Sequence, residues 1–211
     1  MVMQLLNHSL NTLSLKFFSV SLEDLILLCE TLKTMLSFAD LSYPFYYIKE
    51  NIEESIDYIV ESINCEFLVK DSFVYIVSKD ASISEAVEQI HDEETALNLI
   101  EYNRVLFKGD ITEKKRILLQ LGQFIEPILK SKTLSNNGYS NIANDLGFYL
   151  NNFNIRHNNL EGKNSKQFCI DINNNSELEE WYDATYNTLI MAIIATKQIE
   201  LHEKVTQLKK L

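Results

Sequence analysis

Apolar residues spaced three or four positions apart recur along most of the chain and predict a mainly α-helical fold. The first such stripe follows Ser21, which suits a helix N-cap, and predicts a helix to about Phe38. A second stripe begins at Pro44, which suits the first turn of a helix, and ends near Asn64. The outer face of this second helix is acidic, with Glu50, Glu53, Glu54, Asp57 and Glu61.

The apolar period changes between residues 65 and 78. Two runs rich in β-branched and aromatic residues, 65–69 and 73–77, flank Lys70-Asp71-Ser72 and predict a β-hairpin. An isolated hairpin is marginally stable in water, so it needs a helix or a third strand beside it. Residues 1–20 alternate loosely, which leaves open a strand-like arm, as a candidate third strand, or a short helix.

Helical spacing returns at Ser82, which opens a capping box, and short helices are predicted up to a stop at Gly109. A longer helix starts at Thr112, and Pro127 should kink it or remove one of its backbone hydrogen bonds. The Asn-Asn-Gly sequence at 136–138 predicts a turn before the next helix.

A helix from about Ser140 leads into a polar, Asn-rich segment, 158–175, which predicts a long exposed loop. Residues 168–172 form a short apolar run inside this loop, and we predict an extended piece there. A closing helix follows from 176 to about 208. Its run 189–195 is apolar on every side, which predicts a central helix wrapped by the others.

We therefore predict a mainly α fold, a helical bundle of about six or seven helices with one small β-hairpin at about 65–78. The expected organisation is an N-terminal part, 1–94, with the first helices and the hairpin, and a C-terminal helical bundle, 95–211. The two parts are expected to form one compact unit. Five Gly and two Pro among 211 residues are too few for a turn-dense sandwich or barrel.

Charge is unevenly distributed along the chain, whose net charge is −11. Residues 104–166 hold ten Lys or Arg and five Asp or Glu, a balance of +5, whereas the rest holds nine and twenty-five, a balance of −16. The acidic total argues against a general nucleic-acid coat. The basic middle allows a local anion site, with a solvated basic face as the alternative.

The sequence predicts no metal, cofactor or membrane partner. The three Cys are scattered, with neither metal-ligand spacing nor a disulfide framework, and are expected to be reduced thiols of a cytoplasmic protein. The N-terminus lacks the charged and apolar regions of a signal peptide. The longest apolar run, 189–195, is far too short to span a bilayer.

The candidate site lies in the segment 149–163, where Arg156 and His157 stand side by side among Asn residues. An Arg guanidinium binds phosphate through a fixed fork of donors, and a neighbouring His can move a proton near neutral pH. Together they suffice for metal-independent RNA cleavage, with Arg156 and His157 as catalytic residues. The side chains expected to bind the anion beside them are Asn152, Asn158, Asn159, Lys163 and Lys166.

A structural interpretation of the same segment stays open. Arg156 would pair with a carboxylate such as Glu126, Glu179 or Glu180, while His157 and the Asn residues would terminate the helix. Successive helical residues point about 100° apart. Arg156 and His157 therefore face one site only near a fraying helix end or across a dimer.

The layout of residues 95–211 resembles the HEPN superfamily, which includes many bacterial toxin and abortive-infection ribonucleases. A helix ends in an Arg followed by polar residues, and an exposed loop and a long closing helix come after it. Arg156 matches the family's Arg, and His157 matches the variable polar position beside it. The family's second His is absent, because residues 160–163 are Leu-Glu-Gly-Lys.

The resemblance implies a homodimer in which two Arg156 segments face each other across a shared cleft. Because the second His is missing, either His157 or Lys163 handles the proton, or the site binds RNA without cutting it. Two functions follow. One is a HEPN-like protein of bacterial stress or phage defence that cleaves or binds RNA as a homodimer. The other is an acidic, non-catalytic interaction or regulatory module that binds a protein partner. A small-molecule or metal enzyme has almost no support in the sequence.

Overall fold

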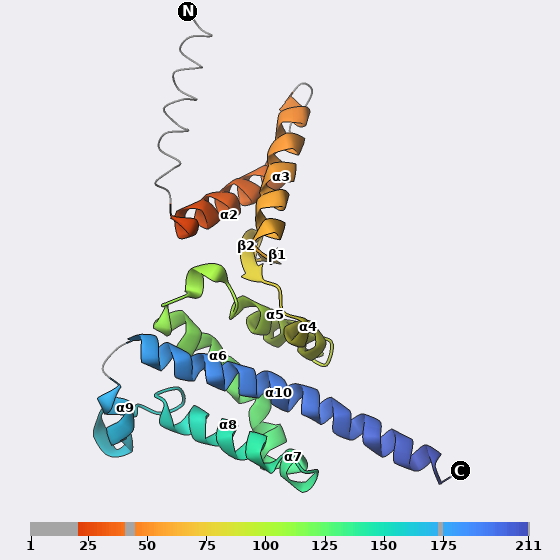
Figure 1. Ribbon diagram of the computed structural model, residues 1–211, viewed down its shortest axis with the longest axis vertical. Coiled ribbons are helices and arrows are strands. Elements are labelled where there is room, and N and C mark those ends of the chain that lie inside the picture. Colours follow the sequence, from red (N-terminus) through yellow and green to blue (C-terminus); the bar gives the residue numbers. More distant parts are fainter. Residues whose placement is uncertain (1–20, 41–44, 173–174, 211) are drawn as a thin grey trace, which may run out of the picture. The chain divides into compact units, whose positions relative to one another are not determined.

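The computed structural model describes residues 21–40, 45–172 and 175–210 (Figure 1). Within these residues it contains nine α-helices and one two-stranded antiparallel sheet. The prediction of a mainly α fold with one small β-hairpin is therefore confirmed. Two predictions, the arm at 1–20 and the helix start at Pro44, fall outside the described residues.

Two compact units make up the chain, residues 1–78 and 79–211, and each is described on its own. The sequence places the division at residue 94 instead. The structure places it directly after the hairpin, because the next helix, α4 (Ala81–Val87), buries its apolar face in the core of the C-terminal unit.

The N-terminal unit packs two helices, α2 (Leu22–Phe38) and α3 (Phe45–Ser62), with a hairpin of β1 (Cys65–Lys70) and β2 (Phe73–Ser78). The side chain of Ser21 caps α2, as the sequence predicts. The hairpin also occupies its predicted residues, and its two strands pair in antiparallel register along their full length.

Helix α2 covers the outer edge of β2 with polar side chains. The amide of Ile76 donates to the Glu30 carboxylate, with N and Oε1 2.8 Å apart. The amide of Val74 donates to the Thr34 hydroxyl, with N and Oγ1 2.9 Å apart. One helical turn thus matches a two-residue step along the strand. The hairpin rests on a helix, one of the two supports that the sequence allows, and its edge amides keep partners there.

The C-terminal unit consists of helices packed around α10 (Asn175–Leu208). The others are α4, α5 (Glu93–Glu101), α6 (Ile111–Lys130), α7 (Thr133–Asn136), α8 (Ser140–Asn152) and α9 (Gln167–Asp171), with 3-10 turns η1 (Val105–Phe107) and η2 (Gly162–Asn164). The short helices α7 and α9 account for the excess over the six or seven helices expected.

Helix α10 supplies a long buried stripe, from Tyr182 to Ile199, that shares one core with the apolar faces of α4, α5, α6 and α8. The apolar run 189–195 lies in this core, as predicted for a central helix. Met191 in the same run is exposed, so the other helices cover α10 on most sides and leave one open to solvent.

Candidate functional site

The predicted site begins where α8 ends. The helix stops at Asn152, and Asn154 then adopts a left-handed backbone conformation with φ 58°. This turn reverses the chain so that the amide of Arg156 donates back to the carbonyl of Leu150, with N and O 3.0 Å apart. Arg156 and His157 therefore follow a helix end, as the sequence predicts.

The Arg156 side chain points into the protein, against α6. Its Nη2 donates to the backbone carbonyl of Gly122 at 2.5 Å and lies 3.8 Å from Oε2 of Glu126. Only 17% of the side chain is exposed. Of the carboxylates proposed as partners from sequence, Glu126 is the one that Arg156 meets. Lys130 and then Arg156 lower the pKa of the Glu126 carboxyl below its ordinary value.

The Asn side chains of the segment bind the chain's own backbone. Asn159 is buried, accepts from the amide of Asn154 at 2.8 Å and donates to the carbonyl of Asn164 at 2.9 Å. Asn158 accepts from two following amides, and Asn152 donates to a carbonyl one turn earlier. These contacts favour the structural interpretation, in which Asn residues end the helix and shape the loop.

His157, Lys163 and Lys166 are exposed on this loop. Among the contacts of the described residues, none joins the side chains of Arg156 and His157. The structure therefore separates the two predicted catalytic side chains, one turned onto α6 and the other toward solvent.

The predicted extended piece at 168–172 is wrong, because residues 167–171 form α9. The side chain of Gln167 donates to Asp171 one turn on, with Nε2 and Oδ1 2.7 Å apart, which is a helical pairing. The helix also buries Cys169 beneath it. A run this short does not distinguish a strand from a helix by its period alone.

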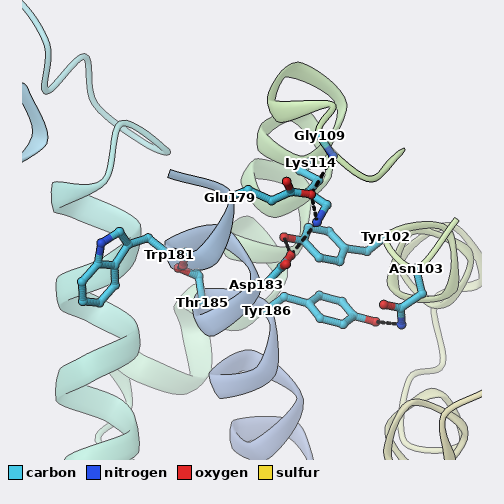
Figure 2. A network of polar contacts seen from close by, with 9 residues as sticks. All are labelled: Tyr102, Asn103, Gly109, Lys114, Glu179, Trp181, Asp183, Thr185 and Tyr186. Carbon is cyan, nitrogen blue, oxygen red and sulfur yellow. Dashed lines mark hydrogen bonds and ion pairs between the residues drawn. The ribbon is translucent and has the colours of Figure 1, made fainter. Parts of the chain in front are cut away.

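A partly buried polar cluster, in which the Asp183 side chain is 47% exposed, lies at the start of α10 and is not predicted by the sequence. Figure 2 shows Lys114 of α6 reaching Glu179 and Asp183 of α10, with its Nζ 2.7 Å from Oε1 and 2.7 Å from Oδ1. The Gly109 amide donates to the same Glu179 oxygen at 2.7 Å. Lys114 is the first of three consecutive basic residues in the basic middle of the chain, and it is buried and paired.

Two stacked tyrosines extend this cluster to α5. The rings of Tyr102 and Tyr186 lie 4.1 Å apart. The Tyr102 hydroxyl donates to Asp183 at 2.8 Å, and that of Tyr186 donates to the Leu99 carbonyl at 2.6 Å. Burial, then the charge of Asp183, raises the pKa of Tyr102 far above its ordinary value. The cluster thus fastens α10 to α5 and α6, and its role is structural.

An open apolar groove lies in the N-terminal unit, between α2 and α3. Its volume is about 440 Å³. Eight of its ten lining side chains are apolar, and the set is Leu25, Leu28, Cys29, Leu32, Ile48, Asn51, Ile52, Ser55, Ile56 and Ile59. The described residues of this unit, 21–40 and 45–78, hold eleven Asp or Glu and three Lys, a net charge of −8.

In the sequence these side chains form the apolar stripes that predict the two helices, and their spacing is that of a buried helical face. The apolar run from Leu25 to Cys29 surrounds most of its helix. One packed hairpin covers only part of such a surface, so the remainder stays open as the groove.

Comparison with protein-family models, curated proteins and solved structures finds no match to this chain. Every helix in the described ranges is too short or too polar to cross a bilayer. Across the same residues, His, Cys, Asp and Glu side chains nowhere gather in the threes that a metal ion would need.

Proposed function

We propose that this protein is a non-catalytic interaction module that binds an α-helical segment of a protein partner in the α2–α3 groove. The observation that carries the proposal is an apolar groove of about 440 Å³ left open along two helices. A helix completes such a pair, because its side chains at i, i+3 or i+4, and i+7 enter a groove that runs along its axis.

The exposure of the groove sets what kind of partner fits it. Leu28 is 40% exposed and Ile48 is 54% exposed. Covering side chains that are about half exposed contributes on the order of 1 kcal/mol each. Useful affinity therefore requires several anchors at once, which an amphipathic helix with one apolar residue per turn provides.

The state of Arg156 supports a non-catalytic role. The Nη2 of its guanidinium already donates to the Gly122 carbonyl and lies 3.8 Å from Glu126 Oε2, and only 17% of the side chain is exposed to an incoming phosphate. Both contacts hold the side chain against α6, away from the exposed His157.

The test is binding of a synthetic amphipathic peptide with an uncharged polar face to the full chain, followed by fluorescence anisotropy. Leu28→Glu places a charge in the groove and should abolish binding. Leu27→Glu is the matched control, because Leu27 is 53% exposed on the same helix and does not line the groove. Equal binding by both variants, or no binding by the wild-type chain, would contradict the proposal.

RNA binding is a second candidate function, favoured by the exposed His157, Lys163 and Lys166 of the loop. Two exposed aromatic rings, Phe148 and Phe168, stack 5.9 Å apart on the neighbouring α8 and α9. Bases of single-stranded RNA stack on such rings while Lys side chains contact the phosphates. The HEPN resemblance and its homodimer remain predictions.

The RNA candidate is tested with purified wild type, Arg156→Ala and His157→Ala, each incubated with total RNA and EDTA. Cleavage by the wild type and by neither variant would favour a catalytic HEPN-like site. Intact RNA in every sample, with no retardation of RNA by the wild type, would exclude this candidate.

A further inference from the structure

A helix that fills the α2–α3 groove has to match its length and its apolar lining. Along α3 the groove extends from Ile48 to Ile59, eleven residues further on, which is about 16 Å at 1.5 Å per residue. On α2 it is lined at positions i, i+3, i+4 and i+7, from Leu25 to Leu32. None of the ten lining residues is charged. The groove therefore fits a helix of about three turns or more, with one apolar stripe and uncharged flanks.

The sequence that precedes α2 has this pattern. At 100° per residue, six of the positions 1–17 fall in one sector of about 100°, and all six hold apolar residues. They are Val2, Met3, Leu6, Leu10, Leu13 and Phe17. Eight of the other eleven residues are polar, and the only charged residue among positions 1–20 is Lys16, about 90° from the centre of this stripe. The pattern favours an amphipathic helix over a strand-like arm.

The place of this segment in the chain brings it close to the groove. Ser21 caps α2, and Leu25, four residues later, already lines the groove. Residues 18–20 are available as a loop, and two to five residues are enough to join two antiparallel helices. A helix over residues 2–17 is about 24 Å long, which is more than the groove requires. A segment tethered this closely has an effective concentration of about 1 mM, so even weak docking keeps it bound.

We propose that residues 2–17 form an amphipathic helix that occupies the α2–α3 groove of the same chain, and that a partner helix binds by displacing it. The inference rests on the proposed function of the groove and adds its regulation. The segment has no Asp or Glu, which suits a unit whose described residues, 21–40 and 45–78, carry a net charge of −8. Once docked, it covers apolar side chains such as Leu28 and Ile48, which the described residues leave 40% and 54% exposed.

The first experiment changes the apolar stripe of residues 2–17 in the full chain. Leu10→Glu, Leu13→Glu places two charges on the stripe and should make the synthetic amphipathic peptide bind about tenfold more tightly than it binds the wild type, measured by fluorescence anisotropy. Tenfold is expected where a segment at an effective concentration of about 1 mM docks with a dissociation constant of about 0.1 mM. Gln4→Glu, Asn11→Glu is the matched control, because it adds the same charge on the polar side and should bind the peptide as the wild type does.

Hydrogen exchange measured by mass spectrometry tests where the segment docks. The amides of residues 6–17 should exchange slowly in the wild type, because a docked helix protects them. Leu28→Glu, in the groove, should make them exchange fast, whereas Leu27→Glu, on the same helix outside the groove, should leave them protected. A saturating concentration of the amphipathic peptide should also remove the protection from the wild type. Circular dichroism checks that each variant is folded.

The outcomes separate the inference from the function on which it rests. Fast exchange of residues 6–17 in the wild type, or protection that Leu28→Glu does not change, would overturn the inference. Peptide binding that Leu28→Glu abolishes would still leave the groove function standing. Protection that depends on Leu28, with no peptide binding to the wild type or to Leu10→Glu, Leu13→Glu, would reject the groove as a partner site and the proposed displacement with it. A dimer that Leu28→Glu dissociates, measured by analytical ultracentrifugation, would assign the groove to a second copy and overturn the inference.

Discussion

The guanidinium of Arg156 donates to the backbone carbonyl of Gly122, with Nη2 and O 2.5 Å apart. The two residues are 34 positions apart and belong to the α8–α9 loop and to α6. Arg156 is the residue that the sequence singles out most clearly for chemistry. In the structure its side chain instead joins the α8–α9 loop to α6. A Cβ added at Gly122 would lie 3.1 Å from Cδ2 of Leu150, so the glycine leaves room there for the end of α8.

Arg156→Ala should lower the free energy of unfolding by about 1–3 kcal/mol, because it removes the charge-assisted hydrogen bond to the Gly122 carbonyl. Arg156→Lys should recover only part of the loss, since an ammonium lacks the planar fork. Urea unfolding followed by circular dichroism measures the change. Lys163→Ala, at an exposed position of the same loop, should stay within about 0.5 kcal/mol of the wild type. Unchanged stability of Arg156→Ala would leave the side chain free for an RNA-binding role.

Two helical glycines make a matched test of the packing around Arg156. Gly147→Ala in α8 should raise stability by about 0.5–1 kcal/mol, because an added Cβ has no atom within 4 Å. Gly122→Ala should lack this gain, since its Cβ would lie 3.1 Å from Cδ2 of the fully buried Leu150 and 3.5 Å from Nε of Arg156. Thermal unfolding of the two variants, measured side by side, tests this difference in stability. Equal stabilisation by both substitutions would show that the side chains of Leu150 and Arg156 move away from the added methyl group at little cost in free energy.

The Glu30 carboxylate supports the edge of the hairpin. Glu30→Leu should cost about 1–3 kcal/mol of stability, because the Ile76 amide loses its acceptor. Glu30→Gln keeps an acceptor oxygen and should cost less. Hydrogen exchange provides a local readout: the Ile76 amide should exchange faster in Glu30→Leu than in Glu61→Leu, a control at an exposed position of α3. Identical exchange of that amide in both variants would contradict the role of Glu30.

Acid should weaken the fold partly through Glu179. Burial raises the pKa of this carboxyl, but bonds from the Gly109 amide and Lys114 outweigh the burial and lower the pKa below its ordinary value of 4.5. A carboxylate whose pKa is lower in the folded state stabilises the fold above its ordinary pKa, and that contribution is lost as pH falls through the folded-state value.

Glu179→Gln should therefore be less stable than the wild type at neutral pH, and the difference should shrink as pH falls below 4.5. Urea unfolding at a series of pH values checks this. Glu180→Gln, at the exposed neighbouring position, is the control. If the free energy of unfolding of Glu179→Gln differed from that of the wild type by the same amount at every pH, a lowered pKa of Glu179 could not be the cause of the difference.

The local periodicity of the sequence predicts much of the secondary structure correctly. The hairpin at β1 and β2, the cap at Ser21 and the start of α8 at Ser140 occur where the sequence predicts them. Each depends on neighbours within a few residues, such as a side chain that caps the next turn. The short α9 was mistaken for an extended piece, because five residues span too little of either period to decide.

The state of the candidate site depends on contacts between residues far apart in the sequence, such as Arg156 and Gly122, which local patterns do not predict. The sequence alone left Arg156 open between a phosphate and a carboxylate, because a guanidinium binds either. The apolar residues of α2 and α3 also have the spacing of a buried helical face, so the sequence does not show that part of this face is open. The sequence by itself thus determined the helices, the hairpin and the uneven charge, since these follow from local spacing and composition. Only the tertiary structure decided that Arg156 meets Gly122 and that the α2–α3 face stays open, because both depend on how elements distant in the chain share a limited core.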